Sequence, residues 1–309
     1  MKANFTENSY EQAIIALFEQ MGYRYECGYD VERDPRNPLH EEVLRASLRR
    51  VNPGLTDYAL GELVKQLKEI DGADLVAQNE TFTDYLQNGM PVEDKAGGEY
   101  RTVNARLIDY DEPEKNDFRI VNQWTVEQFA TRRCDLVVMV NGLPLVVMEL
   151  KSPSNEGVGE DDAYNQIKAY QRQIPCLFVY NAFNVISDML TTRAGTLTAK
   201  QERYMEWKTR DGEYESAAVA DYATFFQGIF DRAREIKPYS VVQICPCGCA
   251  MNFFLTPHMN QAVASDPTSS AQIRMKRKVY GAMCPDMAYY ADHIELSDEA
   301  NDYGTQIGI

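Results

Sequence analysis

Three charged side chains stand at the ends of two apolar runs in the middle of the chain. Asp135 precedes the run 136–140, and Glu149 and Lys151 lie at the end of the run 145–150. Glu149 and Lys151 are two residues apart, so they project from the same face of an extended strand. Burial of such charges is costly unless they pair or bind a metal. Two carboxylates and a lysine could hold Mg²⁺ beside an amine that activates water. A strand end with a surface ion pair is the alternative.

The two apolar runs are separated by Asn141-Gly142. Both residues accept the positive φ of a tight turn, so the pattern predicts a β-hairpin. Each run is nearly continuous in apolar residues, which is typical of central strands buried on both faces. This hairpin would bring Asp135, Glu149 and Lys151 to one end. Arg132 and Arg133, just before Asp135, are then either a solvated strand end or phosphate contacts.

The composition is that of an acidic globular protein. The 309 residues carry a formal net charge of -16, and 44% of them are hydrophobic. A protein that coats DNA should be basic, so we expect this chain alone to bind duplex DNA weakly. The sequence contains no GxxxxGK[ST] phosphate loop, and we therefore expect no ATP hydrolysis. It has neither a long apolar segment nor a signal-peptide core at its start, which predicts a soluble cytoplasmic protein without membrane contact.

The first half of the chain predicts helices followed by strands. Residues 8–21 have helical periodicity, and Asn8 with Glu11 resembles a capping box. Glu11 is either this cap, a solvated side chain, or an acid at the rim of the metal site. The later segments predict a short strand at 23–28, two helices within 32–70, a turn-rich polar stretch at 79–97, a strand at 103–109 and a strand at 118–125. The last of these is either an edge strand of mixed polarity, which we favour, or a strand whose Asn122, Gln123 and Trp124 face DNA.

The second half completes an α/β pattern. A helix over 163–172 places Gln166 and Tyr170 on one face, since they are four residues apart. Further elements are predicted as strands at 176–180 and 184–187, a loop at 191–199, a helix over 201–208 and an amphipathic helix over 222–236. This order predicts a mixed central sheet flanked by helices.

The character of the sequence changes after residue 236. Cys245, Cys247 and Cys249 suggest zinc, but their spacing is not that of a paired CxxC site, and His258 and Cys284 are the only further ligands within reach of them in sequence. Unpaired thiols are the alternative. We therefore divide the chain into a domain at 1–235 and a C-terminal extension at 236–309 whose fold the sequence does not define.

The arrangement Asp-x13-Glu-x-Lys resembles the signature of the PD-(D/E)xK nuclease superfamily. The segments YEQAIIALFEQMGYRY, RCDLVVMVNGLPLVVMELKSP, DAYNQIKAYQRQIPCLFVYNAFNVISD and TRAGTLTA resemble, in this order, the N-terminal endonuclease domain of type I restriction enzyme R subunits. The Gln166–Tyr170 pair matches the QxxxY pattern of that family. The resemblance spans roughly residues 5–235, and it implies a restriction-endonuclease-like core.

The resemblance also implies roles for individual residues. Asp135, Glu149 and the carbonyl of Leu150 would bind Mg²⁺, and Lys151 would orient or deprotonate the attacking water. Gln166 and Tyr170 would be accessory residues, and Glu11 the acid from the first helix. The substrate would be double-stranded DNA, and the partners would be the methyltransferase (M) and specificity (S) subunits.

The resemblance ends before the ATP-driven motor with which R subunits continue. The extension 236–309 occupies the place where that motor would begin, so ATP would be required only by a full-length subunit. Two alternatives to a working endonuclease remain. One is a catalytically idle docking module or degenerate copy without a motor. The other is a stand-alone repair or junction nuclease, which the QxxxY and NAF-VISD segments disfavour.

Overall fold

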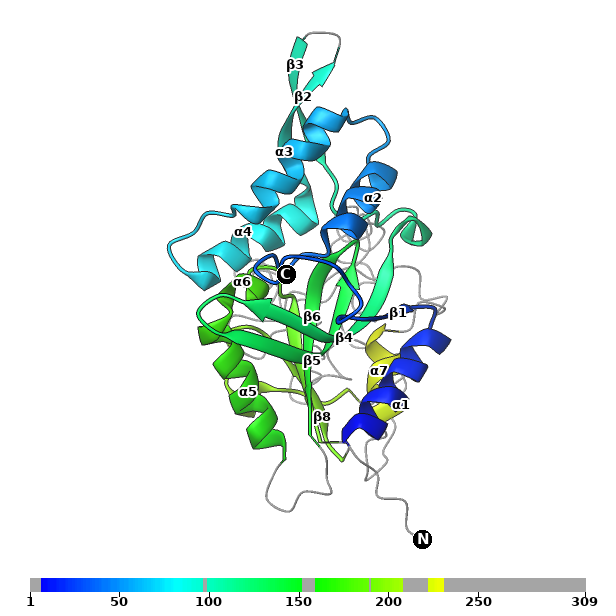
Figure 1. Ribbon diagram of the computed structural model, residues 1–309, viewed down its shortest axis with the longest axis vertical. Helices are drawn as coiled ribbons and strands as arrows, with labels where there is room; N and C mark the ends of the chain where they lie inside the picture. The colour runs from blue at the N-terminus through cyan, green and yellow to red at the C-terminus, as the bar shows by residue number, and fades with distance from the viewer. Residues whose placement is uncertain (1–6, 97–98, 152–158, 189, 208–221, 231–309) are drawn as a thin grey trace, which may run out of the picture.

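The computed structural model describes residues 7–96, 99–151, 159–188, 190–207 and 222–230. Its centre is a six-stranded sheet in the order β1-β4-β5-β6-β7-β8 (Figure 1). The antiparallel strands β4 (Phe118–Glu127), β5 (Thr131–Val140) and β6 (Leu143–Leu150) form the middle. β1 (Arg24–Cys27) runs parallel to β4, β7 (Phe183–Ser187) runs parallel to β6, and β8 (Thr192–Gly195) closes the far edge. The predicted mixed α/β sheet is confirmed, and it is consistent with a restriction-endonuclease-like fold.

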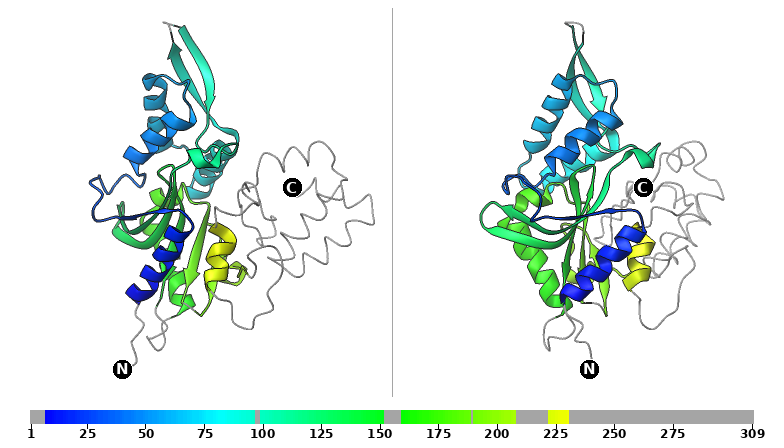
Figure 2. Two further views of the ribbon diagram at one scale, coloured as in Figure 1. Left: turned by 90° about the vertical axis from the view of Figure 1, so that its right-hand side faces the viewer. Right: turned by 45° about the vertical axis from the view of Figure 1, so that its right-hand side comes forward.

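Helices cover both faces of this sheet. α1 (Glu7–Gln20) and α7 (Tyr222–Phe230) pack together over one face, where Phe18, Phe226 and Phe230 contact one another. α5 (Glu160–Gln173) and α6 (Pro175–Phe178) cover the other face (Figure 2). The central strands are therefore buried on both sides, which explains their continuous apolar sequence. Among the described helices, none combines the length and the apolar content that crossing a bilayer requires.

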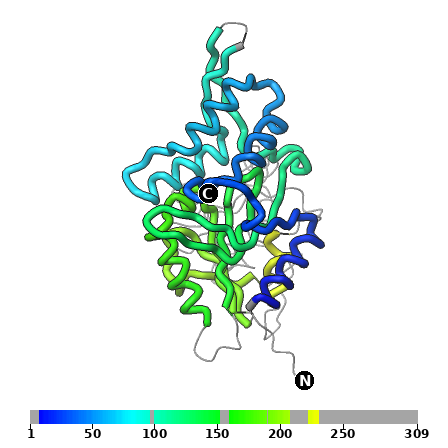
Figure 3. The backbone as a smooth tube through the Cα atoms, viewed as in Figure 1, coloured from blue at the N-terminus to red at the C-terminus, as the bar shows by residue number. Residues whose placement is uncertain are grey.

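A helical insertion separates β1 from β4. It contains α2 (Glu41–Val51), α3 (Asp57–Lys68), α4 (Leu75–Asn88) and the two-stranded hairpin of β2 (Met90–Ala96) and β3 (Glu99–Ala105). Figure 3 shows this part of the chain extending beyond one end of the sheet. Its apolar residues continue the core on the α1 side of the sheet. The insertion therefore buttresses the end of the sheet where the β5–β6 turn lies.

The Asn141-Gly142 turn between β5 and β6 is confirmed, and it is buried under the insertion. Asn141 and Gly142 have φ values of 54° and 80°. The Asn141 side chain is fully buried, and its Nδ2 donates to the carbonyl oxygen of Leu107 at 2.9 Å. Its Oδ1 accepts the backbone N–H of Asp117 at 2.8 Å. The carbonyl of Gly142 accepts the N–H of His40 at 3.0 Å. The turn thus anchors the central hairpin to the start of α2 and to the segment before β4.

A β-bulge at Leu145 sets which residues of β5 and β6 face each other. Next to the turn, Val140 pairs with Leu143, but beyond the bulge Leu136 pairs with Met148. One residue further on, this register puts Asp135 opposite Glu149. Without the bulge, Asp135 would instead lie opposite Met148, and the two carboxylates would project from opposite faces. The carbonyl oxygen of Leu145 accepts the N–H of Ala182 at 2.7 Å, which holds the bulge in place.

Several predictions about local structure were wrong. Residues 176–180 do not form a strand, because Pro175 starts the helical turn α6. The stretch 79–97 is not mainly turns: it contains the end of α4, capped by Gly89 at φ 80°, and then β2. The segment 118–125 is not an edge strand, since β4 lies between β1 and β5. Its polar residues are instead used inside the fold.

Further predictions were also wrong. The predicted loop 191–199 contains β8, which pairs with β7. The predicted helix 201–208 is a 3-10 turn (Gln201–Arg203), after which Met205 bridges back to Ala194. The start of α1 lies before Asn8, and the side chain of Glu11 crosses to β4, so these residues form no capping box. Cys245, Cys247, Cys249 and the rest of the extension lie outside the described residues, so the domain boundary at 235 stays a prediction.

We predict that Gly142→Ala destabilises the protein by roughly 2–4 kcal/mol. A Cβ there would lie 2.6 Å from the carbonyl oxygen of His40 and 2.7 Å from the amide nitrogen of Leu44, at a positive φ. Gly61→Ala in α3 is the matched control. Because a Cβ there meets nothing within 4 Å, it should be neutral or stabilise by about 0.5–1 kcal/mol. Urea denaturation of both variants measures the difference. Equal stability would show that the turn does not anchor the hairpin.

Candidate active site

The three charged residues of the hairpin lie together at one end of the central strands, near the start of β5 and the end of β6. Asp135 is half-buried and Glu149 is only 3% exposed. The Oδ2 atom of Asp135 accepts the backbone N–H of Leu150 at 2.9 Å. The N–H of Lys151 donates to the carbonyl oxygen of Ser187 at 2.8 Å. Both neighbouring strands therefore fix the end of β6, and the structure brings Asp135, Glu149 and Lys151 together as the sequence predicts.

Glu149 carries a charge in an unfavourable place. Its Oε2 atom is buried and accepts no hydrogen bond from the described residues. Burial, together with the charge of Asp135, raises the pKa of Glu149 to about 8, although the nearby Lys151 and the Tyr170 hydroxyl oppose this shift. An unsatisfied buried carboxylate oxygen is costly in the absence of a further cation. The environment of Glu149 therefore favours a metal ion at this oxygen.

The ammonium group of Lys151 lies against oxygens of the candidate site. Its Nζ forms an ion pair with Glu149 Oε1 and donates to the carbonyl oxygen of Leu150 at 3.2 Å. Two of the three predicted metal ligands thus turn their oxygens toward one ammonium group. Carboxylate and carbonyl oxygens are the ligands that Mg²⁺ and Ca²⁺ use in proteins. Asp135, Glu149 and Leu150 therefore fit a hard divalent cation, with Lys151 beside it.

Tyr170 and Gln166 of α5 lie near the same end of the central strands. The hydroxyl of Tyr170 donates to the carbonyl oxygen of Arg133 at 2.9 Å. Burial, followed by the nearby charge of Glu149, raises the pKa of Tyr170, whereas Gln166 lowers it slightly. Tyr170 is therefore a neutral hydrogen-bond donor that fixes β5 two residues before Asp135. Gln166 lies one helical turn away on the same face and hydrogen-bonds that hydroxyl.

Glu11 reaches the neighbourhood of the site from α1. Its side chain is 6% exposed and accepts hydrogen bonds from Asn122 Nδ2 at 2.7 Å and Gln123 Nε2 at 2.9 Å. Gln123 falls opposite Asp135 in the β4–β5 register and has a φ of 55°. Glu11 is therefore neither a solvated residue nor a helix cap. Gln123, which the sequence offered as a residue that could face DNA, instead hydrogen-bonds Glu11 and falls opposite Asp135.

The three acids do not form one cluster. Within the described residues, no group of three or more His, Cys, Asp and Glu side chains is arranged to hold a metal. The set that fits a cation is thus Asp135, Glu149 and the Leu150 carbonyl, without Glu11. Gln123, which hydrogen-bonds Glu11 and falls opposite Asp135, has a positive φ of 55°, and no residue pattern signals such a backbone conformation.

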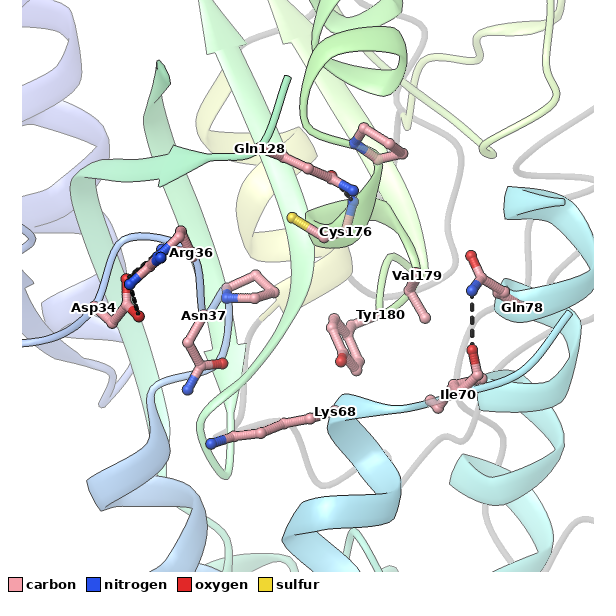
Figure 4. Close-up of a pocket in the computed structure, with 12 residues that line it drawn as sticks. Asp34, Arg36, Asn37, Lys68, Ile70, Gln78, Gln128, Cys176, Val179 and Tyr180 are labelled. Carbon is pink, nitrogen blue, oxygen red and sulfur yellow. Dashed lines mark hydrogen bonds and ion pairs between the residues drawn. The ribbon is translucent and has the colours of Figure 1, made fainter. Parts of the chain in front are cut away.

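A hollow of about 400 Å³ lies elsewhere, between the segment after β1, α3, α4 and α6 (Figure 4). None of the candidate site residues lines it. Gln78 donates to the carbonyl of Ile70, and Gln128 accepts the N–H of Cys176. Burial raises the pKa of the Cys176 thiol to about 11, which keeps it protonated and unreactive. This hollow has no feature of a reaction centre.

Comparison with known proteins shows the family of the chain. The family model described as type I restriction enzyme R protein N terminus matches residues 4–203. The chain belongs to this family. It is 35% identical over 229 residues to the type I restriction enzyme HindI endonuclease subunit of Haemophilus influenzae, and 32% identical over 224 residues to a putative MjaIXP endonuclease subunit of Methanocaldococcus jannaschii.

The extent of these matches differs between relatives. Each of these two covers 69% of this chain, but the match spans only 21% of the relative. The type I restriction enzyme EcoprrI endonuclease subunit of Escherichia coli is 31% identical over 267 residues, covering 76% of this chain and 79% of that protein. Residues 4–203 thus correspond to the N-terminal part of type I restriction enzyme R proteins, and the match spans about a fifth of the length of the first two relatives.

We predict that Glu149→Gln stabilises the metal-free protein at pH 8 by roughly 1–3 kcal/mol. The pKa of Glu149 is raised from 4.5 to about 8 in the folded state. Between these values the folded state binds more protons than the unfolded state, so stability falls as the pH rises. Gln carries no such penalty, and its advantage should shrink toward pH 5.

Urea denaturation in the presence of a chelator, at a series of pH values, measures this difference. Glu42→Gln, an exposed change on α2, should show no pH-dependent difference from wild type. A Glu149→Gln variant that is destabilised equally at pH 5 and pH 8 would contradict the cost assigned to the buried charge.

Proposed function

We propose that this chain is the Mg²⁺-dependent nuclease module of a type I restriction–modification system and hydrolyses phosphodiester bonds of double-stranded DNA. The observation that carries the proposal is the buried, unpartnered Oε2 of Glu149, two residues from a lysine that contacts both Glu149 and the Leu150 carbonyl. Membership of the R-subunit family supports it. Such a set binds a hard cation and leaves an amine next to it.

In this proposal Asp135, Glu149 and the carbonyl of Leu150 hold the cation. A bound Mg²⁺ would supply a Lewis acid at the phosphoryl oxygen and lower the pKa of a water ligand. The ammonium group of Lys151 offsets negative charge on the phosphate and orients the attacking water. Tyr170 keeps the start of β5 in place through the Arg133 carbonyl, so that Asp135 stays opposite Glu149.

The proposal gives the remaining steps to partners. Base-specific recognition would belong to an S subunit, and methylation sensing to M subunits. Movement along DNA would require ATP and the motor of a full-length subunit, for which this chain contains no phosphate loop. The net charge of -16 agrees with a module that relies on other subunits to hold its DNA.

We predict that Asp135→Ala, Glu149→Ala and Lys151→Ala each lower the nicking rate of supercoiled plasmid in Mg²⁺ by about 10²-fold or more. Glu42→Gln should leave the rate unchanged, because its side chain is exposed on α2, outside the site. Calorimetry should show loss of Mg²⁺ binding in Asp135→Ala and Glu149→Ala. If the wild-type chain binds Mg²⁺ but leaves the plasmid intact, alone and with its M and S partners, it is the idle docking module instead.

We predict that Tyr170→Phe lowers the nicking rate per folded molecule by more than its loss of stability explains. The variant loses one hydrogen bond to the Arg133 carbonyl, worth about 1 kcal/mol, while the ring keeps its apolar packing. The measured pair is the nicking rate per folded molecule and the melting temperature. Tyr164→Phe on the same helix, near Ala199, is the matched control. A fall in melting temperature with an unchanged nicking rate would make Tyr170 a core residue only.

A further inference from the structure

Tyr29 and Arg133 form an exposed pair beside the candidate active site. Tyr29 is 61% exposed and lies just after β1, while Arg133 is an exposed residue of β5. The Arg133 guanidinium carbon lies 5.7 Å from the centre of the Tyr29 ring, and its Nη1 donates to the Tyr29 hydroxyl. An aromatic ring and a guanidinium in contact attract each other even at the surface. The pair therefore holds a positive charge in a defined place.

The charge of Arg133 is not cancelled by a carboxylate. In the described part of the chain, eight arginines form ion pairs with Asp or Glu, namely Arg24, Arg36, Arg45, Arg49, Arg101, Arg106, Arg119 and Arg193. No such pair within the same residues involves Arg133. In a chain with a net charge of -16, an arginine oriented by a ring rather than by an acid keeps its full charge for an external anion.

The backbone on both sides of this pair is fixed. The Arg133 carbonyl accepts the Tyr170 hydroxyl at 2.9 Å. The N–H of Gly28, next to Tyr29, donates to the carbonyl of Asn122 at 2.9 Å. A Cβ at Gly28 would lie 2.7 Å from that oxygen, so only glycine allows this approach. Tyr29 and Arg133 are thus held by the same strands that carry the candidate site.

Arg133 also lies at a useful distance from the candidate ligand Asp135. They are two residues apart on β5, which corresponds to about 7 Å along a strand. This step is comparable with the separation of neighbouring phosphates on one DNA strand. A phosphate at the cation site of Asp135 and Glu149 would therefore place an adjacent phosphate near Arg133. The Tyr29 ring provides an apolar face that suits a sugar or a base without reading its identity.

We infer that Arg133, oriented by Tyr29, binds the DNA phosphate next to the one that is cleaved. The inference rests on the proposed nuclease function and adds a positioning site for its substrate. Arg133 supplies a bidentate donor for a phosphate oxygen pair, and Tyr29 limits the directions in which that donor points. The contact is independent of sequence, as expected for a module that leaves recognition to another subunit.

The test is binding of a short fluorescein-labelled duplex by the full chain at low ionic strength, with Ca²⁺ in place of Mg²⁺, followed by fluorescence anisotropy. Arg133→Ala should weaken binding roughly tenfold and reduce the slope of log K against log salt by about one. Tyr29→Leu should weaken binding less, whereas Tyr29→Phe should keep most of it. Arg45→Ala, which removes an equal charge from α2, should bind as wild type does.

Several outcomes would overturn the inference. Equal affinities of Arg133→Ala and Arg45→Ala would do so, as would wild-type protein that does not bind the duplex at low salt. If Arg133→Ala instead loses binding to polyglutamate while duplex binding is kept, the pair serves an acidic protein segment. Plasmid nicking tests the nuclease proposal separately. Binding that depends on Arg133 without nicking, alone and with M and S partners, would refute the nuclease function and not the contact. Nicking that is unaffected by Arg133→Ala would do the reverse.

Discussion

The cost of burying the Glu149 carboxylate is the constraint on which the arrangement of this domain depends. Glu149 ends a central strand that is apolar on both faces, and it faces the carboxylate of Asp135. One of its oxygens is paired with Lys151 and the other has no partner among the described residues. A protein selected only for stability would place an apolar residue there. The packing of the surrounding strands and helices offsets the free-energy cost of this buried charge.

The pairing register of the central hairpin decides where the Glu149 carboxylate lies. The Asn141-Gly142 turn is locked by the insertion at one end, and the Leu145 bulge shifts the pairing by one residue between the turn and the site. The bulge is held by the N–H of Ala182, the residue before β7. Because the side-chain period of a strand is two residues, this single extra residue decides that both carboxylates face the same way. The site is thus built by a feature located several residues away from it.

The elements on either face complete the site by different means. α5 contributes Tyr170, which hydrogen-bonds backbone of β5. α1 contributes Glu11, which is bound by Asn122 and Gln123 of β4. Both helices therefore act on the strands that carry the acids. Among the described residues, Tyr29 and Arg133 beside the acids stay exposed.

The sequence by itself determined the central hairpin, its turn, the triad of Asp135, Glu149 and Lys151, and the helix that carries Gln166 and Tyr170. These rest on local preferences: positive φ at Asn-Gly, apolar continuity in buried strands, and the four-residue period of a helix face. Only the tertiary structure decided the Leu145 bulge, the buried position of Glu11, the interior place of β4 and the contact between Tyr29 and Arg133. Each of these depends on residues that are distant in sequence, and the helical turn at Pro175 replaced a strand because a proline at the first helical position overrode an apolar run. Pairing register and long-range contacts leave no local pattern, because they are fixed by the packing of the whole domain.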